Sequence, residues 1–266
     1  MKEGEGRLPE AALARLGREG VGGRLFTAAF GPDELALVRA AGCEPVAVVS
    51  GTAVYHFGPA PLGIRGSQEV SALSQAVAQA WQTALDRLLE EAREVGADGV
   101  IGVQVVRSRH DWGEGVADVL AQGTAVRVER GDLPHGRGGR PFTCLCSPSA
   151  FWAMVTGGYR PLSVVAGHVV WALGHQTLTH ALRVGHGQVE LIGMTEGLYD
   201  ARELALARME AQAGSLAGAD GVLGVRLVEE AHEWGPALFE FRAEGTAVAR
   251  FADREPPRPE WVVVAE

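Results

Sequence analysis

The chain has 266 residues, of which 47% are hydrophobic and 21% are charged. Such a composition is typical of globular proteins with a buried core, and it excludes a disordered chain. The net charge of −9 at pH 7 predicts an acidic surface that repels phosphate backbones, so nucleic acid is not an expected partner.

Residues 1–23 are predicted to form an N-terminal helical or flexible segment that precedes the folded units. The stretch MKEGEGRLPEAALARLGREG is too polar for a secretory signal peptide. The chain contains no run of about 18 uninterrupted apolar residues, so no membrane span is expected. Its three cysteines are too few for a disulfide framework, which favours a reducing, cytoplasmic location.

Residues 24–128 are predicted to form one folded unit. Pro32 and Gly42 are typical of the start and the end of a short helix. Valine-rich apolar runs predict strands, and alanines that recur every four residues from Ala76 predict one long amphipathic helix. In chain order we expect a helix, a strand, a long helix and two strands over residues 33–41, 46–57, 68–95, 99–107 and 116–128.

The second half of the chain repeats the first. The run GADGVIGVQVV at Gly96–Val106 returns as GADGVLGVRLV at Gly218–Val228, an offset of 218 − 96 = 122. Over the 31 positions of Gly96–Val126, 16 residues are identical at this offset. Chance would give about two identities from average residue frequencies. Upstream, LFTAAF at Leu25–Phe30 matches PFTCLC at Pro141–Cys146 with an offset of 141 − 25 = 116.

The repeat sets the remaining boundaries. Residues 129–140, which are rich in glycine and proline, are predicted to be a linker. Residues 141–251 form the second unit, and residues 252–266 are a C-terminal tail whose WVVVA stretch suits a short edge strand. The second unit is expected to place its elements over residues 149–156, 162–173, 189–216, 221–229 and 238–251. Its six extra residues, 122 − 116, fall between Gly174 and Gly218.

Both units are expected to have an α+β fold, each a β-α-β-β arrangement in which one long helix lies across a small antiparallel sheet. Such a unit makes a poor solitary core, because one sheet face or edge stays open. We expect the two copies to bury these surfaces against each other and against further chains. Gly102, Gly123, Gly224 and Gly245 lie inside predicted strands, where the missing side chain suggests close approach of another backbone or a helix.

The run ALDRLLEEAREVGADGVIGVQV at Ala84–Val105, followed by GTAV at Gly123–Val126, resembles the YbjQ-like family of heavy-metal-binding domains. The second copy is similar over YDARELALARMEAQAGSLAGADGVLGVRL at Tyr199–Leu227. The resemblance implies a dodecin-like β-α-β-β fold and a homo-oligomeric ring, with pentamers typical of single-domain members. It carries over no metal ligand residue by residue, and the cysteine often found in the first strand of the family is absent from both copies.

The corner between the last two strands of each unit is the candidate site, with a histidine, an acidic residue and a tryptophan in each: His110, Asp111, Trp112, His232, Glu233 and Trp234. Neighbours in extended backbone point to opposite faces, so a single corner chelates poorly. Because zinc takes about three or four ligands, a divalent or soft heavy-metal ion would bind these histidines and acids only where several subunits bring their corners together. Two alternatives stay open. In one the corner is a hairpin whose Trp112 and Trp234 pack on neighbouring subunits, and in the other it contacts a small molecule.

Other reactive side chains form weaker patterns. His168, His175, His180 and His186 have spacings that match no compact zinc motif, and we interpret them as surface or pocket residues with a pH-sensing option. Cys144 and Cys146 form a Cys-x-Cys pair whose thiols share one face of a strand. We interpret them as small buried hydrophobic residues, with a soft-metal pair as the alternative, whereas Cys43 stands alone.

No pattern indicates catalysis. The chain lacks a Gly-x-Ser-x-Gly elbow and a His-Glu-x-x-His motif, and Lys2, its only lysine, cannot complete a P-loop. We therefore predict no catalytic residue and no enzyme activity, and expect a cytoplasmic homo-oligomer that binds or scaffolds other molecules. The alternatives are a metal-sequestering protein, a ring that binds a small molecule, and a hydrolase or isomerase with an unrecognised site.

Overall fold

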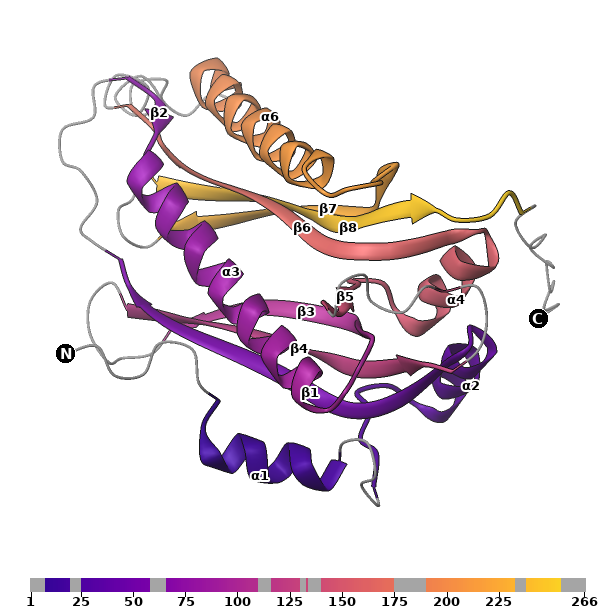
Figure 1. Ribbon diagram of the computed structural model, residues 1–266. Helices are drawn as coiled ribbons and strands as arrows, with labels where there is room; N and C mark the ends of the chain where they lie inside the picture. Colours follow the sequence, from indigo (N-terminus) through magenta and orange to yellow (C-terminus); the bar gives the residue numbers. More distant parts are fainter. Residues whose placement is uncertain are drawn as a thin grey trace, which may run out of the picture.

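The computed structural model describes residues 8–19, 25–57, 66–109, 116–129, 133, 140–174, 190–232 and 238–254 (Figure 1). The helices are α1 (Glu10–Glu19), α2 (Pro32–Ala40), α3 (Ser71–Glu94), α4 (Pro148–Thr156) and α6 (Ile192–Gly214). The strands are β1 (Cys43–His56), β2 (Gln68–Glu69), β3 (Gly99–Arg109), β4 (Val116–Val128), β5 (Phe142–Thr143), β6 (Tyr159–Ala172), β7 (Gly221–His232) and β8 (Leu238–Arg250). Among the described helices, none combines the length and the apolar character that crossing a membrane requires.

The structure confirms the predicted α+β fold with its two β-α-β-β units. The first sheet has the strand order β1-β4-β3-β5, and the second sheet has the order β2-β6-β8-β7. In each sheet the three long strands pair antiparallel, with β4 between β1 and β3 and β8 between β6 and β7. One long helix packs on each sheet, α3 on β1 and β4, and α6 on β6 and β8.

A glycine in the first long strand of each repeat lets the long helix come close to the sheet. A Cβ on Gly51 would overlap the backbone of Ala84 and Leu88 in α3, and a Cβ on Gly167 would overlap the backbone of Ala205 in α6. The strand glycines are offset by 167 − 51 = 116 and the helix alanines by 205 − 84 = 121. Five of the six extra residues of the second repeat therefore precede its helix contact, and one follows it.

Helix α3 lies between the two sheets, whereas α6 covers the outer face of the second sheet (Figure 1). Val77 and Trp81 of α3 share one core cluster with Val164 and Val170 of the second sheet. Helix α6 buries a narrower stripe of every fourth residue, at Gly197, Ala201, Ala205, Met209 and Ala213. Strand β6 of the second sheet is thus contacted by both long helices, and α3 is the element that joins the two repeats into one core.

The four strand glycines divide into two kinds. Gly102 and Gly224 adopt φ values of +63° and +66° at bulges, where β3 and β7 shift register against their neighbours. No described atom lies within 4 Å of a Cβ at either position, so the left-handed backbone is what favours glycine there. Another backbone does approach Gly102, whose N–H donates to the carbonyl oxygen of Cys146 at 3.1 Å, whereas no described atom occupies the corresponding place at Gly224. At Gly123 and Gly245 a valine side chain of the adjacent strand fills the space that a Cβ would need.

The repeats exchange short strands at their edges. Strand β2 of the first repeat pairs antiparallel with Trp171–Ala172 at the end of β6. Strand β5 of the second repeat pairs parallel with Gly99–Val100 at the start of β3. The long helix predicted from residue 68 therefore begins only at Ser71, because Gln68–Glu69 pair with the other repeat.

Candidate functional site at the junction between the repeats

Strand β5 connects the first sheet to the second. The N–H of Phe142 donates to the carbonyl oxygen of Asp98, which precedes β3, at 3.0 Å. On its other side, the N–H of Val164 in β6 donates to Oγ1 of Thr143 at 2.7 Å. The segment 141–146 therefore lies between β3 of the first repeat and β6 of its own repeat.

Phe142 closes this junction. Its ring covers Gly99 so closely that a Cβ on Gly99 would overlap the ring atoms. The ring also stacks on Phe151 of α4, with 6.1 Å between the ring centroids. Because Gly99 has no side chain, the ring of Phe142 from the other repeat can pack directly on the first residue of β3. We call this place on Gly99, and the corresponding place on Gly221, the seat.

The counterparts of Phe142 and Gly99 in the other repeat do not make this contact. Phe26 corresponds to Phe142 at the offset 142 − 26 = 116, and the two residues are 47% and 7% exposed. Gly221 corresponds to Gly99 at the offset 221 − 99 = 122, yet no described atom lies within 4 Å of its Cβ position. Phe26 of the first repeat is thus an exposed ring, and Gly221 of the second repeat has no described ring packed on it.

The segment that carries Phe26 is held on its own repeat in the same way as the segment around β5. The N–H of Val48 donates to Oγ1 of Thr27 at 2.8 Å, and the N–H of Ala29 donates to Oγ1 of Thr124 at 3.0 Å. The second repeat makes the same two bonds at equivalent positions, from Val164 to Thr143 and from Leu145 to Thr246. The exposed phenylalanine is therefore presented by an ordered backbone.

The start of strand β3 is buried, whereas that of its counterpart β7 is exposed. Ile101 and Val103 of β3 are 0% exposed, whereas their counterparts in β7, Leu223 and Val225, are 41% and 45% exposed. The second repeat covers β3 in the first, and the described residues leave β7 open. An open strand edge that carries apolar side chains is a surface on which another chain can add.

A buried ionic cluster also crosses the junction. Arg107 of β3 forms ion pairs with Glu240 of β8 and Glu230 of β7. An oxygen of Glu240 lies 3.3 Å from Nδ1 of His168, and the His168 ring packs edge-on against Trp81 of α3. Because Arg107 and Glu240 are almost fully removed from solvent, each charge depends on its partner for compensation. The cluster therefore fixes the position of one repeat against the other.

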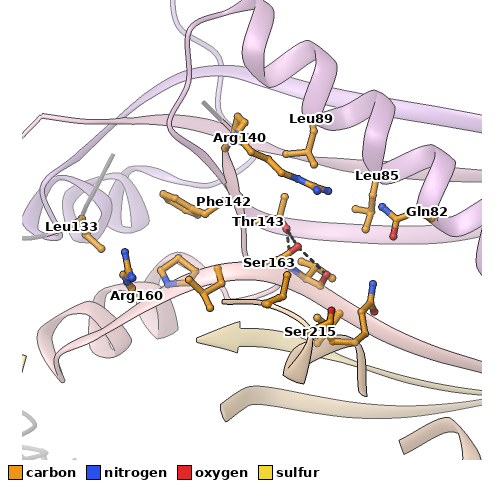
Figure 2. Close-up of a pocket in the computed structure, with 17 residues that line it drawn as sticks. Gln82, Leu85, Leu89, Leu133, Arg140, Phe142, Thr143, Arg160, Ser163 and Ser215 are labelled. Atoms are coloured by element: carbon orange, nitrogen blue, oxygen red, sulfur yellow. Dashed lines mark hydrogen bonds between the residues drawn. The ribbon is translucent and has the colours of Figure 1, made fainter. Parts of the chain in front are cut away.

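A cavity of about 370 Å³ lies between α3, β6 and the C-terminal end of α6 (Figure 2). Leu85 and Leu89 line its α3 side, and Ser163 lies on the opposite, β6 side. Arg140 and Arg160 are the charged residues of the described lining, which includes no aspartate, glutamate or histidine. Two cations beside apolar side chains suit a small anion with an apolar body. No pair of acid and base groups lines this cavity.

Helix α1 packs at the corresponding place in the first repeat. Arg15 donates to the carbonyl oxygen of Val48 at 2.7 Å, and the neighbouring Leu16 is buried in the core. Val48 corresponds to Val164, which lines the cavity, at the offset 164 − 48 = 116. The cavity therefore marks a position that the first repeat fills with a helix of its own.

Cys144 and Cys146 follow directly after β5. Cys144 is buried and Cys146 is partly exposed, and the N–H of Cys146 lies 3.2 Å from Sγ of Cys144. The interpretation as a small buried hydrophobic residue fits Cys144 better than Cys146. Within the described ranges, no group of three or more histidine, cysteine, aspartate or glutamate side chains could hold a metal ion.

The predicted corner sites fall in the sequence between the last two long strands of each repeat. β3 ends at Arg109 and β4 begins at Val116, and β7 ends at His232 and β8 begins at Leu238. Of the predicted site residues only the backbone of His232 belongs to the described part, and these fall outside it: His110, Asp111, Trp112, Glu233 and Trp234. Their metal-binding and contact roles therefore stay predictions.

The second-repeat histidines are only partly described. His175, His180 and His186 fall outside the described residues. His168 is buried beside Glu240, so its interpretation as a surface or pocket residue is wrong. A long valine-rich strand that contains one histidine carried no signal of that burial.

Sequence reasoning missed the residues that build the junction. Phe26 with Phe142 and Gly99 with Gly221 are identical pairs of the repeat, and this identity was the available signal for a shared contact. Arg107 has no such signal, because Glu229 stands at its counterpart position, 229 − 107 = 122.

Comparisons with known proteins agree with the duplicated fold. The sequence model of the YbjQ family, described as "Putative heavy-metal-binding", matches residues 63–129 and 160–250. These two segments are consistent with tandem copies, one on each side of the predicted linker. No solved structure matches the chain.

Three relatives differ in how much of the chain they cover. An encapsulin nanocompartment protein of Mycobacterium tuberculosis is 34% identical over 239 residues, which span 90% of this chain and 91% of the relative. A UPF0145 protein of Thermotoga maritima is 35% identical over 92 residues, 33% of this chain and 85% of its own length. A UPF0145 protein of Pyrococcus furiosus is 42% identical over 62 residues, 23% of this chain and 53% of its own length.

Proposed function

Because the chain belongs to the YbjQ-like family and carries two of its domains, we propose that it is a non-enzymatic building block that assembles head to tail with copies of itself. One observation carries the proposal. Within the chain, Phe142 packs on Gly99 and the start of β3 is buried. The corresponding groups, Phe26 and the start of β7, are exposed. In the assembly, Phe26 of one chain lies on Gly221 of the next chain, whose exposed Leu223 and Val225 become covered.

This contact joins two different surfaces of identical chains. Such a heterologous contact closes into a ring when the rotation from one chain to the next divides a full turn. The proposed partner is therefore another copy of the chain, in a closed homo-oligomeric ring. A ring of five chains, the pentamer that the family resemblance implies, would hold ten repeats.

The contact between chains is expected to be weaker than the contact within a chain. Trp81 and Leu89 of α3 correspond at the offset 121 to Arg202 and Glu210 of α6. The face of α3 that carries Trp81 and Leu89 is apolar, whereas the corresponding face of α6 is partly charged. A more polar interface suits chains that fold first and then associate.

The printed name of the Mycobacterium tuberculosis relative, an encapsulin nanocompartment protein, supports assembly as part of the function. We propose that this chain acts in the cytoplasm as a binding or scaffolding component of a protein nanocompartment. The open β7 edge and Phe26 would supply its self-association.

A matched pair of variants tests the proposed assembly. Phe26→Ala should shift the mass measured by sedimentation velocity to smaller species and change the unfolding free energy of the chain by less than about 0.5 kcal/mol, as for a surface position. Phe142→Ala removes the equivalent buried ring and should lower the unfolding free energy by about 3–5 kcal/mol. An unchanged mass for Phe26→Ala would show that this residue makes no contact between chains.

A second candidate function is the binding of a small anion in the cavity beside Arg140 and Arg160. The two arginines in the lining favour it, and one of them, Arg140, also lies 3.6 Å from a carboxylate oxygen of Asp86. Benzoate, an anion with an apolar ring, should raise the melting temperature of the wild-type protein and leave that of Arg160→Met unchanged. Benzyl alcohol is the neutral control. Equal shifts with both compounds, or none with either, would count against this function.

The metal-sequestering function stays a proposal that the family description supports. The ligands would be His110, Asp111, His232 and Glu233 from corners of several subunits, binding a divalent or soft heavy-metal ion. Untagged protein should then contain stoichiometric metal by elemental mass spectrometry, and the His110→Ala/His232→Ala double variant should lose it. Metal-free protein whose melting temperature does not rise with zinc, copper or nickel would contradict this function.

The corner tryptophans are proposed to anchor contacts between subunits. Trp112→Ala should shift the assembly toward smaller species, because a buried tryptophan typically contributes about 3–5 kcal/mol. Light scattering measures this shift, and Trp234 is proposed to act in the same way. An unchanged mass would rule out the anchor role of Trp112.

A further inference from the structure

The two cysteines after β5 are tied to the first sheet through their backbone. The carbonyl oxygen of Cys144 accepts from the N–H of Val103 at 2.9 Å. The carbonyl oxygen of Cys146 accepts from the N–H of the bulge glycine Gly102 at 3.1 Å. The Cys-x-Cys segment therefore lies at the point where the repeats are joined, and it includes a bend at Cys146.

The sulfur of Cys144 contacts the backbone of Cys146. The backbone N–H of Cys146 points at Sγ of Cys144, with 3.2 Å between the nitrogen and the sulfur. Oγ1 of Thr246 lies 3.9 Å from the same sulfur. Cys144 is fully buried and Cys146 is partly exposed, so a small reagent from solvent can reach Cys146, whose own backbone N–H lies against the sulfur of Cys144.

The environment shifts the pKa values of the two thiols in opposite directions. The hydrogen bond with Cys144 lowers the pKa of Cys146 to about 7, with smaller contributions from Thr246 and the positive charge of Arg226 and with burial opposing them. Burial raises the pKa of Cys144 well above the ordinary value. Near neutral pH, Cys146 is therefore partly thiolate, the nucleophilic form, and Cys144 is a protonated thiol.

We propose that Cys144 and Cys146 form a redox-active dithiol in which Cys146 is the nucleophile, Cys144 is the resolving thiol and a hydroperoxide is the oxidant. The Cys146 thiolate attacks the terminal peroxide oxygen and breaks the O–O bond. The alkoxide that leaves takes a proton from water, and Cys146 becomes a sulfenic acid.

The Cys144 sulfur then attacks the sulfenic sulfur and the S–O bond breaks. The departing hydroxide takes the Cys144 proton and leaves as water, while the S–S bond forms. The two cysteines are together oxidised by two electrons, and the hydroperoxide is reduced to an alcohol and water.

Oxidation would act on the junction within the chain and not on the proposed contact between chains. Ala28 and Phe30 stand at the equivalent positions of the first repeat, 144 − 28 = 116 and 146 − 30 = 116. A disulfide requires Cα atoms about 4.4–6.8 Å apart, whereas residues two apart on a fully extended chain are separated by about 6.6–7.2 Å. Bond formation would therefore tighten the bend at Cys146, against which Gly102 and Val103 are hydrogen-bonded.

Alkylation of the full-length wild-type protein tests the first step, with Cys43 as an internal control. Burial, with the nearby charges of Asp98 and Glu44, raises the pKa of Cys43 to about 12. With iodoacetamide at pH 7, peptide mass spectrometry should find Cys146 modified at least about a hundredfold faster than Cys43. The rate at Cys146 should reach half of its maximum near pH 7. A midpoint at the ordinary thiol value, about 8.5, would overturn the proposal.

Hydrogen peroxide tests the second step. The wild-type protein should lose two hydrogens within the peptide that contains both cysteines, and a thiol reductant should restore them. Cys144→Ser should stop at a sulfenic acid on Cys146 that dimedone traps, and Cys146→Ser should form neither product. Oxygen addition to Cys146 of the wild type without a disulfide would overturn the role of Cys144. These wild-type readouts stand even if a serine variant fails to fold.

Discussion

At the residue scale, glycines decide how closely the long helices approach their sheets. Close approach was predicted at four other strand glycines, whereas Gly51 and Gly167, which lie under the helices, were missed. The reason is physical, because a glycine at a bulge and a glycine under a helix look alike in sequence. Only the pairing register separates Gly102, with its positive φ, from Gly51, which faces the backbone of Ala84.

Adding one methyl group at such a glycine tests this contact. Gly51→Ala places a Cβ against the backbone of Ala84 and Leu88, so it should lower the unfolding free energy by about 1–3 kcal/mol, as overpacking does. Gly17→Ala is the matched control, since nothing lies within 4 Å of its Cβ position in α1. It should raise the unfolding free energy by up to about 1 kcal/mol through helix propensity. Urea denaturation measures both, and equal effects would contradict the close approach.

The ionic cluster is the second feature that matters at this scale. Arg107→Met leaves Glu240 buried without its main charge partner, so it should lower the unfolding free energy by about 3–5 kcal/mol. Arg127→Met removes an exposed pair with Glu129 and should cost at most about 1 kcal/mol. A second substitution, Glu240→Gln, should recover much of the loss in the Arg107→Met background. Additive losses in urea denaturation would show that the two charges do not depend on each other.

At the element scale, sequence periodicity predicted most of the fold. The strand over residues 116–128 was placed at its observed bounds, and the helix over 33–41 within one residue. The start of α3 was misplaced because Gln68–Glu69 form β2 through pairing with β6, where Gln68 meets a residue 104 positions further along the chain (172 − 68 = 104). A pairing of this range has no local signal. The same holds for β5, where an apolar stretch was recognised as part of the repeat and its partner strand was not.

The ion pair between β2 and α6 should make stability depend on pH. Burial of the Glu69 carboxyl raises its pKa, but hydrogen bonds from Arg208 and nearby serines outweigh burial, so the pKa lies below the ordinary value. A carboxyl with a lowered folded-state pKa stabilises the fold above its unfolded-state pKa. This contribution is lost as the pH falls through the folded-state pKa.

Glu69→Gln measures that contribution. At pH 7 the variant should unfold with a free energy lower by about 0.5–1 kcal/mol, a modest value because Arg208 is partly exposed. The difference from the wild type should shrink as the pH falls through the acidic range where Glu69 becomes protonated. Urea denaturation from pH 7 to pH 3 provides the comparison. A difference that stays constant over this range would show that the carboxylate does not stabilise the fold.

At the scale of the whole molecule, duplication has produced one closed junction and two open ends. α3, β3 and the seat at Gly99 are covered because a second repeat follows the first. Among the described residues, none covers Leu223 and Val225 of β7 or occupies the place beside Gly221 that corresponds to the place of Phe142 beside Gly99. The β-α-β-β pattern of each unit predicted an open surface that would need to be buried. The pattern did not identify that surface, because the corner residues follow β3 and β7 in the sequence, whereas the junction forms at Gly99, the first residue of β3.

The mass of the untagged protein under native conditions tests the central claim most directly, namely that the junction within the chain is repeated between chains. Native mass spectrometry at micromolar concentration should give one closed homo-oligomer whose protein mass is an integral multiple of 28.1 kDa. Dilution should release single chains that keep their folded charge-state distribution. A folded species of 28.1 kDa as the sole form at every concentration would contradict the account.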